Sequence, residues 1–336
     1  MIPPPPVVRR RRRYGSEAGS TRAVPFVRAR RASRLDQAAD VNRDARWSPF
    51  ARHTSILGGM SLYQRQDTPH LVAPVMIAAF DGWIDASSAA SGAAGHLASD
   101  ASTVAVFNAD LIYDYRSRRP VLDVVDGTLT HLVWPEMRLA RTQVDGRDLL
   151  ILHGAEPDFR WRELGADIVE LALSLGVTQW VSLGAIPAAV PHTRPTPVLA
   201  TASADGLLHD YEVKGPEGLL RVPAAALSAL EMAISQSGVG SVGFFAQVPH
   251  YVGGPWAPAS IALLDHVGRH LGVEVPLGEL PADAISQRGR VDALVQDQDE
   301  AREYLERLEE LPIEGPIPSG DDIASEIERF LQDNDS

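Results

Sequence analysis

The chain has 336 residues, of which 45% are hydrophobic, and it carries a formal net charge of −13. This length and composition leave room for about two domains with ample cores. The chain has no cysteine, which excludes disulfides, thiolate metal sites and cysteine nucleophiles and fits the reducing cytoplasm. No segment reaches the roughly 18 consecutive apolar residues of a membrane span, so we expect a cytoplasmic protein without membrane contact.

The charge is distributed unevenly along the chain. Residues 1–59 hold 13 Arg and 4 acidic residues, a balance of +9, whereas residues 60–336 hold 18 basic and 40 acidic residues, a balance of −22. The acidic body argues against nucleic-acid binding by the folded part. Residues 1–59 show no sustained apolar period, so we predict a disordered Arg-rich extension. The compositional break leaves a second reading open, in which translation starts at Met60.

Strands and helices alternate from about Leu71 to Val275. The apolar patterns predict strands over 71–80, 103–107, 177–183, 198–202 and 242–248, and helices over 85–99, 161–175, 223–236 and 257–271. Pro74 suggests that the first strand lies at a sheet edge or enters the ladder late. Such alternation predicts an α/β fold, in which a mostly parallel, mixed sheet is covered by helices on both faces.

Four further apolar runs interrupt this alternation. They cover residues 121–125, 128–133, 137–144 and 148–153, and Asp145-Gly146 between the last two is a strong hairpin signal. We therefore expect an antiparallel insertion in the α/β domain, which we place over residues 60–275.

The character of the chain changes after Pro276. Apolar residues such as Val291, Leu294 and Leu305 sit among many charges, which is typical of amphipathic helices. A proline-rich break follows, and Asp321 or Asp322 can cap a last helix. Residues 276–336 are thus predicted to form a small helical C-terminal region.

The first candidate site follows the strand that ends at Phe80. Asp81 and Asp85 flank a glycine turn before a helix of small residues. The two carboxylates could share acid–base work, or Asp85 could cap the helix while Asp81 bonds backbone N–H groups of the turn. Trp83 either anchors an interface or covers the sheet rim. Glu156 lies at the end of another strand, where acidic residues complement the dipole of the following helix.

Two other strand exits place a histidine directly after Val-Pro, in the segments that contain His192 and His250. Proline fixes the backbone, so the next side chain is aimed. The histidines either flank one pocket at the carboxyl edge of the sheet or bond loop carbonyls and stiffen the rim. The candidate pocket residues are Asp81, Trp83, Asp85, Glu156, His192, Thr193, Arg194, His250 and Tyr251.

Several signatures of chemistry are missing. The sequence has no G-x-x-x-x-G-K-[ST] loop, no G-x-G-x-x-G after a strand and no G-x-S-x-G elbow. No histidine spacing suggests zinc, and Lys214 is the only lysine. We therefore assign no cofactor, metal or catalytic residue.

Four motifs in order carry a resemblance to a known family. They are F-D-G-W-I-D-A (80–86), H-G-A-E-P-D-F-R-W (153–161), L-G-A-I-P-A-A-V-P-H-T-R-P-T-P-V (183–198) and Q-V-P-H-Y-V (247–252). Together they resemble the bacterial branch of the proteasome assembly chaperone family, the type related to the second chaperone subunit. The resemblance covers about residues 70–310.

The resemblance implies a three-layer α/β/α domain of nucleoside-phosphorylase-like architecture, with a small helical C-terminal domain. It also implies a non-catalytic protein that self-associates, with a trimer as one possible stoichiometry, and that engages a proteasome-like complex. Chaperones of this group dock through a tail of a hydrophobic residue, tyrosine and any residue, whereas this sequence closes with Asp333-Asn334-Asp335-Ser336. The alternative function is a small-molecule site at the sheet rim, for a nucleoside-like or carboxylate ligand.

Overall fold

The computed structural model describes residues 61–216 and 218–311. The predicted Arg-rich extension and the last predicted helix, which would begin at Asp321 or Asp322, lie outside these residues. Within the described part, no helix is both long enough and apolar enough to cross a bilayer.

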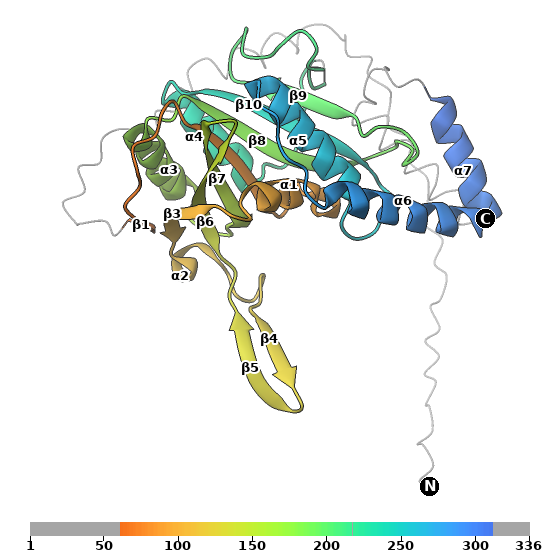
Figure 1. Ribbon diagram of the computed structural model, residues 1–336, viewed down its shortest axis with the longest axis horizontal. Helices are drawn as coiled ribbons and strands as arrows, with labels where there is room; N and C mark the ends of the chain where they lie inside the picture. The colour runs from red at the N-terminus through yellow and green to blue at the C-terminus, as the bar shows by residue number, and fades with distance from the viewer. Residues whose placement is uncertain (1–60, 217, 312–336) are drawn as a thin grey trace, which may run out of the picture. The chain divides into compact units, whose positions relative to one another are not determined.

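The centre of the described fold is an eight-stranded mixed sheet in the order β1-β3-β6-β7-β2-β8-β10-β9 (Figure 1). Its strands are β1 (Tyr63–Arg65), β2 (Val75–Asp81), β3 (Ser102–Phe107), β6 (Met137–Val144), β7 (Arg147–Ala155), β8 (Gln179–Ala188), β9 (Val198–Ala202) and β10 (Gly240–Pro249). The central strands β7, β2, β8 and β10 are parallel neighbours, and antiparallel strands flank them on both sides. The expected mixed α/β sheet is confirmed, and the four parallel strands deliver their carboxyl ends to one rim.

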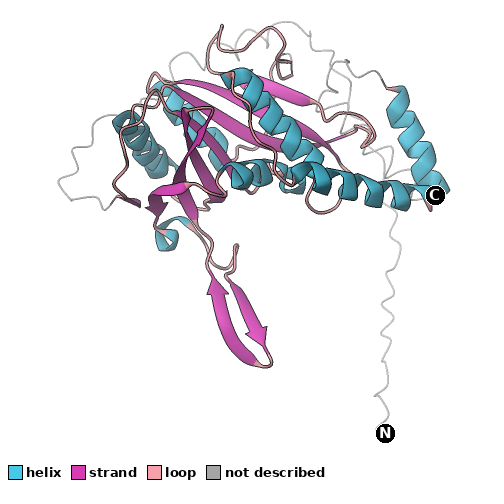
Figure 2. Cartoon of the chain, viewed as in Figure 1, coloured by secondary structure: helices cyan, strands magenta, loops and turns pink. Residues whose placement is uncertain are grey.

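Helices cover both faces of this sheet (Figure 2). On one face lie α1 (Ala89–Leu97) and α5 (Ala257–Leu271), and on the other α3 (Trp161–Leu175) and α4 (Ala226–Gln236). Strand β2 shows the alternation that this requires, because Ile77 belongs to the core under α1 and α5 and Met76 to the core under α3 and α4. The three-layer arrangement follows from a strand set that is apolar on both faces.

The small residues of α1 explain how closely it packs. A Cβ added at Gly92 would lie 3.0 Å from the Ser260 hydroxyl of α5, and that hydroxyl donates to the Ala89 carbonyl at 2.8 Å. The predicted helix start at Asp85 was wrong by one turn, because a 3₁₀ turn, η1 (Ala86–Ser88), precedes α1. Ser87 within it has a left-handed φ of 53°.

Proline effects were predicted in part. Strand β2 begins only at Val75, so the late entry suggested by Pro74 is correct, whereas the edge position is wrong because β2 lies between β7 and β8. Helix α4 begins at Ala226 rather than at Pro223. The reason is a remote cap, since Glu156 Oε1 accepts from the Ala226 N–H at 2.7 Å.

The four insertion runs separate into two kinds. Residues of the first two form β4 (Val121–Val125) and β5 (Thr128–Val133), a hairpin that pairs with no strand of the main sheet. The last two become β6 and β7, which pair antiparallel with each other as predicted. Placing them in an insertion was wrong, because both belong to the main sheet, where β7 also pairs in parallel with β2. The Asp145-Gly146 turn joins them as predicted, with positive φ at both residues.

The C-terminal helices are α6 (Leu280–Gln296) and α7 (Asp299–Glu310), and a short helix α2 (Ala109–Ile112) follows β3. Helix α6 packs against α5, and α7 packs against α6. The charged sequence with spaced apolar residues thus forms two helices within the described part. They lie on the side of the helical layer formed by α1 and α5.

Candidate functional site

The carboxyl rim holds all nine predicted site residues, and Asp81 ties this rim to the hairpin segment. Arg118 donates from Nη1 to Asp81 Oδ2 and from Nη2 to the Asp81 carbonyl, both at 2.7 Å. Arg118 precedes β4 by three residues, so this bidentate contact fixes the base of the hairpin to the end of β2. Asp81 therefore has a structural partner.

Asp85 caps the helix that follows it. Its Oδ1 accepts from the N–H groups of Ala90 and Ser91 at 2.8 and 3.1 Å, and its Oδ2 accepts from the Ser91 hydroxyl at 2.5 Å. Burial raises the pKa of this carboxyl, and the Ser91 and Ala90 hydrogen bonds oppose that rise. Of the two interpretations of Asp85, the geometry matches the cap.

Glu156 joins three segments of the rim. Its Oε2 accepts from the Trp83 N–H at 2.6 Å, its Oε1 caps α4, and its own N–H donates to the Asp81 carbonyl at 3.0 Å. Gly82 is required beside it, because a Cβ there would lie 2.1 Å from Oε2. The Trp83 side chain is left 68% exposed above this junction.

His192 connects the rim to helix α6. Its Nε2 lies 2.9 Å from Asp292 Oδ1, and its Nδ1 lies 2.8 Å from the Tyr251 hydroxyl. Since a carboxylate can only accept, Nε2 carries a hydrogen that it donates to Asp292. His192 is only 2% exposed, and burial raises the pKa of Tyr251 to about 12.

Thr193 and Arg194 connect the same rim to the end of α7. Thr193 Oγ1 donates to Glu309 Oε1 at 2.5 Å. Arg194 donates to the carbonyls of Glu309 and Leu311, the latter at 2.8 Å. Cations stabilise the carboxyl end of a helix, where carbonyls lack partners, so these two residues hold α7 against the sheet.

His250 matches the second interpretation of the histidines. Its ring Nδ1 lies 3.2 Å from the Ala188 carbonyl, which the second interpretation expects. Its ring also meets Tyr304 of α7 edge-on, with centroids 5.7 Å apart.

The nine residues therefore divide into two groups. Asp81, Trp83, Asp85 and Glu156 bind segments of the α/β domain to one another, whereas the other five attach the C-terminal helices. Ser87 links the segments that carry the two groups. Its hydroxyl donates to the Val252 carbonyl at 3.2 Å, and its carbonyl accepts from the Trp256 N–H at 2.9 Å.

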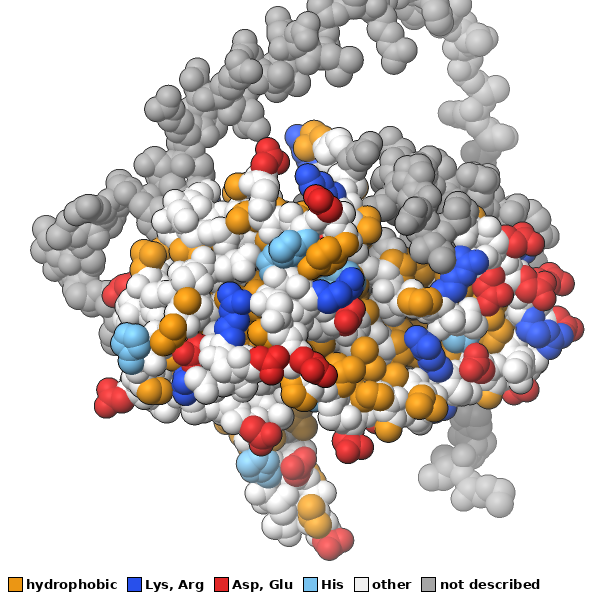
Figure 3. All heavy atoms as spheres, turned by 45° about the horizontal axis from the view of Figure 1, so that its top comes forward, with side chains coloured by type: hydrophobic (Ala, Val, Ile, Leu, Met, Phe, Trp, Pro, Cys, Tyr) orange, Lys and Arg blue, Asp and Glu red, His pale blue; other side chains and the backbone are white. Residues whose placement is uncertain are grey.

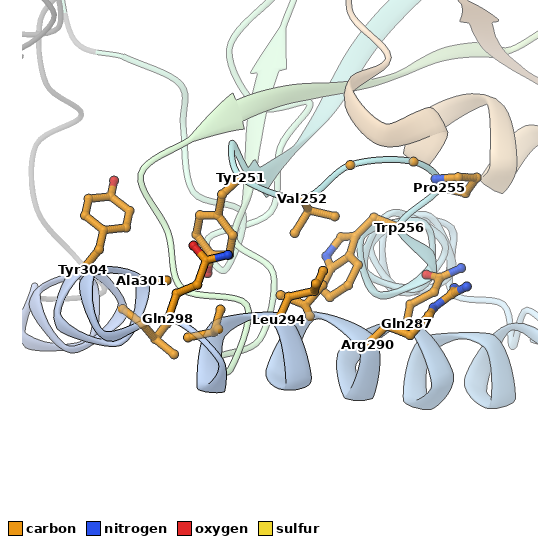
Figure 4. Close-up of a pocket in the computed structure, with 15 residues that line it drawn as sticks. Tyr251, Val252, Pro255, Trp256, Gln287, Arg290, Leu294, Gln298, Ala301 and Tyr304 are labelled. Atoms are coloured by element: carbon orange, nitrogen blue, oxygen red, sulfur yellow. The ribbon is translucent and has the colours of Figure 1, made fainter.

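A hollow of about 560 Å³ lies beside the second group, between the 251–256 loop and helices α6 and α7 (Figure 4). Of the nine predicted residues only Tyr251 lines it. The prediction missed Trp256, Arg290 and Tyr304, which also line it. The apolar spacing of Val291, Leu294 and Leu305 was the available signal, but it could not show which surface these helices cover.

The sequence analysis did not single out two further polar residues, His153 near the rim and Glu231 on α4. The pKa of His153, at the end of β7, is lowered by burial, and its buried Nε2 has no partner in the described residues. Glu231 of α4 accepts from the hydroxyls of Ser182 and Ser241 at 2.7 and 3.3 Å, and burial raises its pKa. No group of three or more metal-binding side chains gathers within residues 61–216 and 218–311.

The hairpin carries the largest group of exposed large apolar side chains in the described part of the chain. Eight large apolar side chains in and beside it are between 42% and 69% exposed: Val121, Leu122, Val124, Val125, Leu129, Leu132, Val133 and Trp134. Figure 3 shows the hairpin projecting from the α/β domain, whereas acidic side chains gather over α7. Large apolar side chains that are exposed singly are normal on a protein surface, whereas exposed apolar side chains that cluster mark interaction sites.

These features define a class of protein: an α/β/α domain whose rim is occupied by structural contacts, with attached C-terminal helices and a projecting apolar hairpin. The family model named PAC2 family matches residues 79–295. The chain belongs to the PAC2 family, and the resemblance read from its motifs is confirmed. No protein with a curated description matches it.

Three solved structures illustrate the relationship. A Mycobacterium tuberculosis protein of unknown function, Rv2714, is 34% identical, with a TM-score of 0.71 over 75% of this chain and 91% of that one. A PAC2 family protein from Streptomyces avermitilis is 37% identical, with a TM-score of 0.62 over 69% and 99% of the two chains. The M. tuberculosis proteasome-assembly chaperone homologue Rv2125 is 36% identical, with the same TM-score and coverage.

Proposed function

We propose that this protein is a non-catalytic, homo-oligomeric interaction module of the cytoplasm that acts as a chaperone in assembling a proteasome-like complex. The observation that carries the self-association is the apolar hairpin β4–β5. Family membership and the similarity to a protein described as a proteasome-assembly chaperone homologue support the assembly role.

The hairpin has the properties of a docking arm rather than of a surface loop. A two-stranded hairpin by itself is marginally stable in water, yet both of its strands are exposed along their whole length. Apolar residues also face each other across the hairpin, as in the pairs Val124 with Leu129 and Leu122 with Leu132. A hairpin that remains in water would be expected to carry polar residues at such positions. Full burial of such a side chain contributes about 1.5–3 kcal/mol, so a second copy could stabilise the arm substantially.

The base of the arm is fixed, which favours a defined assembly. Arg118 is bonded to Asp81, and the ring of Tyr115 packs against Trp134 with centroids 4.8 Å apart. A rigid base reduces the conformational entropy lost when the arm binds. We therefore expect a closed oligomer of one size, with a trimer as the stoichiometry proposed from the family resemblance.

The variant Val124→Glu/Leu129→Lys tests the self-association. The two residues face each other across the hairpin, so the new charges attract each other and preserve the hairpin while removing its apolar contacts. The matched control is Leu173→Lys/Met232→Glu, which changes two exposed apolar residues on α3 and α4. In sedimentation velocity we expect dissociation to monomers for the hairpin variant alone. An unchanged oligomer would refute self-association through the hairpin.

The assembly role requires a separate measurement. Purified proteasome core subunits from the same organism, mixed with this protein during ring assembly, should show transient co-migration and faster ring formation. The hairpin variant serves as the comparison, because it separates assembly activity from self-association. Ring formation at the same rate with and without the protein would refute the role while leaving the oligomer intact.

The alternative, a small-molecule site formed by the nine rim residues, has less support. All nine have side chains that can hydrogen-bond, and eight of these side chains, all except that of Trp83, bond within the described part of the protein. Those contacts supply a structural role for Asp81, Asp85, Glu156, His192 and Arg194. The space able to receive a ligand lies beside these residues.

A further inference from the structure

We propose that the hollow between the 251–256 loop and helices α6 and α7 binds a monoanionic carboxylate with an apolar alkyl or aryl body. This inference goes beyond the interaction function and does not depend on the hairpin. Small-molecule sites typically have volumes of roughly 300–1,000 Å³, and this hollow measures about 560 Å³.

The walls of the hollow are mostly apolar and aromatic. Trp256, only 2% exposed, lies on the domain side, and Leu294 of α6 lies in front of it (Figure 4). Tyr251 and Tyr304 stand toward the end formed by α7. The exposed part of these walls, such as Leu294 at 66% exposure, favours a ligand with an apolar body that would remove its carbon atoms from water.

The wall formed by the loop is held in place without a ligand. The Trp256 N–H donates to the Ser87 carbonyl at 2.9 Å, and the next residue, Ala257, donates to Gln287 Oε1 at 2.6 Å. Gln287 therefore ties the loop to α6 and keeps its amide N–H groups for another acceptor. A preformed wall lowers the entropy cost of binding.

Arg290 determines the charge of the ligand. It is the one charged side chain among the residues that line the hollow, and it forms no ion pair with any residue of the described ranges. Figure 4 shows it beside Gln287 at the end below Pro255. A guanidinium flanked by an amide suits a carboxylate, which can accept from both groups.

The surroundings favour one negative charge over two. Helix α7, at one end of the hollow, carries six acidic residues and two arginines, whereas α6 carries two of each. A dianion such as a phosphate monoester would face one arginine within this negative field. A monocarboxylate is fully compensated by Arg290.

Isothermal titration calorimetry of the full chain tests the proposal. The carboxylate probes are octanoate and 3-phenylpropionate, and the controls are octanol and octylamine, which match the chain length of octanoate. We expect a carboxylate to bind at least tenfold more tightly than octanol or octylamine. Arg290→Gln should remove that preference. The control Arg162→Gln changes an exposed arginine on α3, which covers the opposite face of the sheet, and should keep the carboxylate preference.

Two results would overturn the proposal. One is failure of both carboxylates to bind the wild-type protein more tightly than the alcohol. The other is an unchanged carboxylate preference in Arg290→Gln. Because Arg290 is exposed on the helix surface, this variant should fold, and sedimentation of the same sample distinguishes loss of ligand from loss of the oligomer.

Discussion

The central strands and the hairpin strands are built from similar residues but have opposite environments. Strand β2 reads V-M-I-A-A-F-D and is buried except for its last residue, whereas β4 reads V-L-D-V-V and is exposed throughout. The helices of the same chain cover both faces of β2, and nothing in the described part of the chain covers β4. An apolar strand sequence thus predicts that the strand is covered, but it does not predict whether the same chain or another molecule covers it.

The largest expected difference between the two regions is in stability. Phe244 lies fully buried in β10, and Leu129 is 69% exposed in β5. We expect Phe244→Ala to lower the free energy of unfolding by about 3–5 kcal/mol, because it leaves a cavity. Leu129→Ala should change it by less than about 0.5 kcal/mol when urea unfolding is measured at a concentration where the protein is monomeric. Equal losses would mean that the hairpin packs on its own domain.

An intermediate effect is expected where the C-terminal helices attach. His192→Ala removes the two hydrogen bonds of the imidazole ring, to Asp292 and to Tyr251, which should weaken the attachment of α6 by about 1–3 kcal/mol. Hydrogen exchange of α6 and α7 amides should then be faster by about tenfold or more, while exchange in β2 stays the same. Unchanged exchange in both regions would show that His192 does not hold the helices.

A smaller effect concerns the carboxyl under α4. Burial raises the pKa of Glu231, so the protonated form is favoured in the fold. Its stabilising contribution is present below the ordinary glutamate pKa of about 4.3 and is lost as the pH rises through the raised value. Glu231→Gln should therefore raise the unfolding free energy at pH 8 and leave it unchanged near pH 4. A constant difference between pH 4 and pH 8 would contradict this assignment.

The smallest change should come from removing the hairpin. When residues 121–133 are replaced by a short Gly-Ser linker, the monomer should lose less than about 1 kcal/mol, because β4 and β5 pair only with each other. Chemical unfolding of the dilute protein measures this. A loss of several kcal/mol would place the hairpin in the core of its own domain.

Local signals in the sequence predicted most of the elements. Helices 161–175 and 257–271 and strand 198–202 match α3, α5 and β9 at both ends, because their apolar spacing, glycine stops and turns are local. The start of α4 could not be found this way, since its cap comes from Glu156, seventy residues earlier. The membership of β7 in the central sheet was hidden for the same reason, because pairing with β2 is not a local property.

The site residues were located at the correct rim, but their partners were not predictable. Four strand exits share one edge because β7, β2, β8 and β10 are parallel neighbours. The sequence predicted the shared edge, but not the parallel pairing of β7 with β2. The partners of His192 and Arg194 lie about one hundred residues later, on helices whose docking surface the sequence does not specify. Arg290 gave no signal, since an arginine on an amphipathic helix is normally solvated.

The most direct test of self-association uses the absence of cysteine in the natural chain. Leu129→Cys on the hairpin and Met232→Cys on α4 each introduce a single thiol at an exposed apolar position. If the hairpin is the docking arm, maleimide should label Leu129→Cys more slowly as protein concentration rises, while the labelling rate of Met232→Cys stays constant. Equal rates for both thiols at every concentration would contradict the proposal.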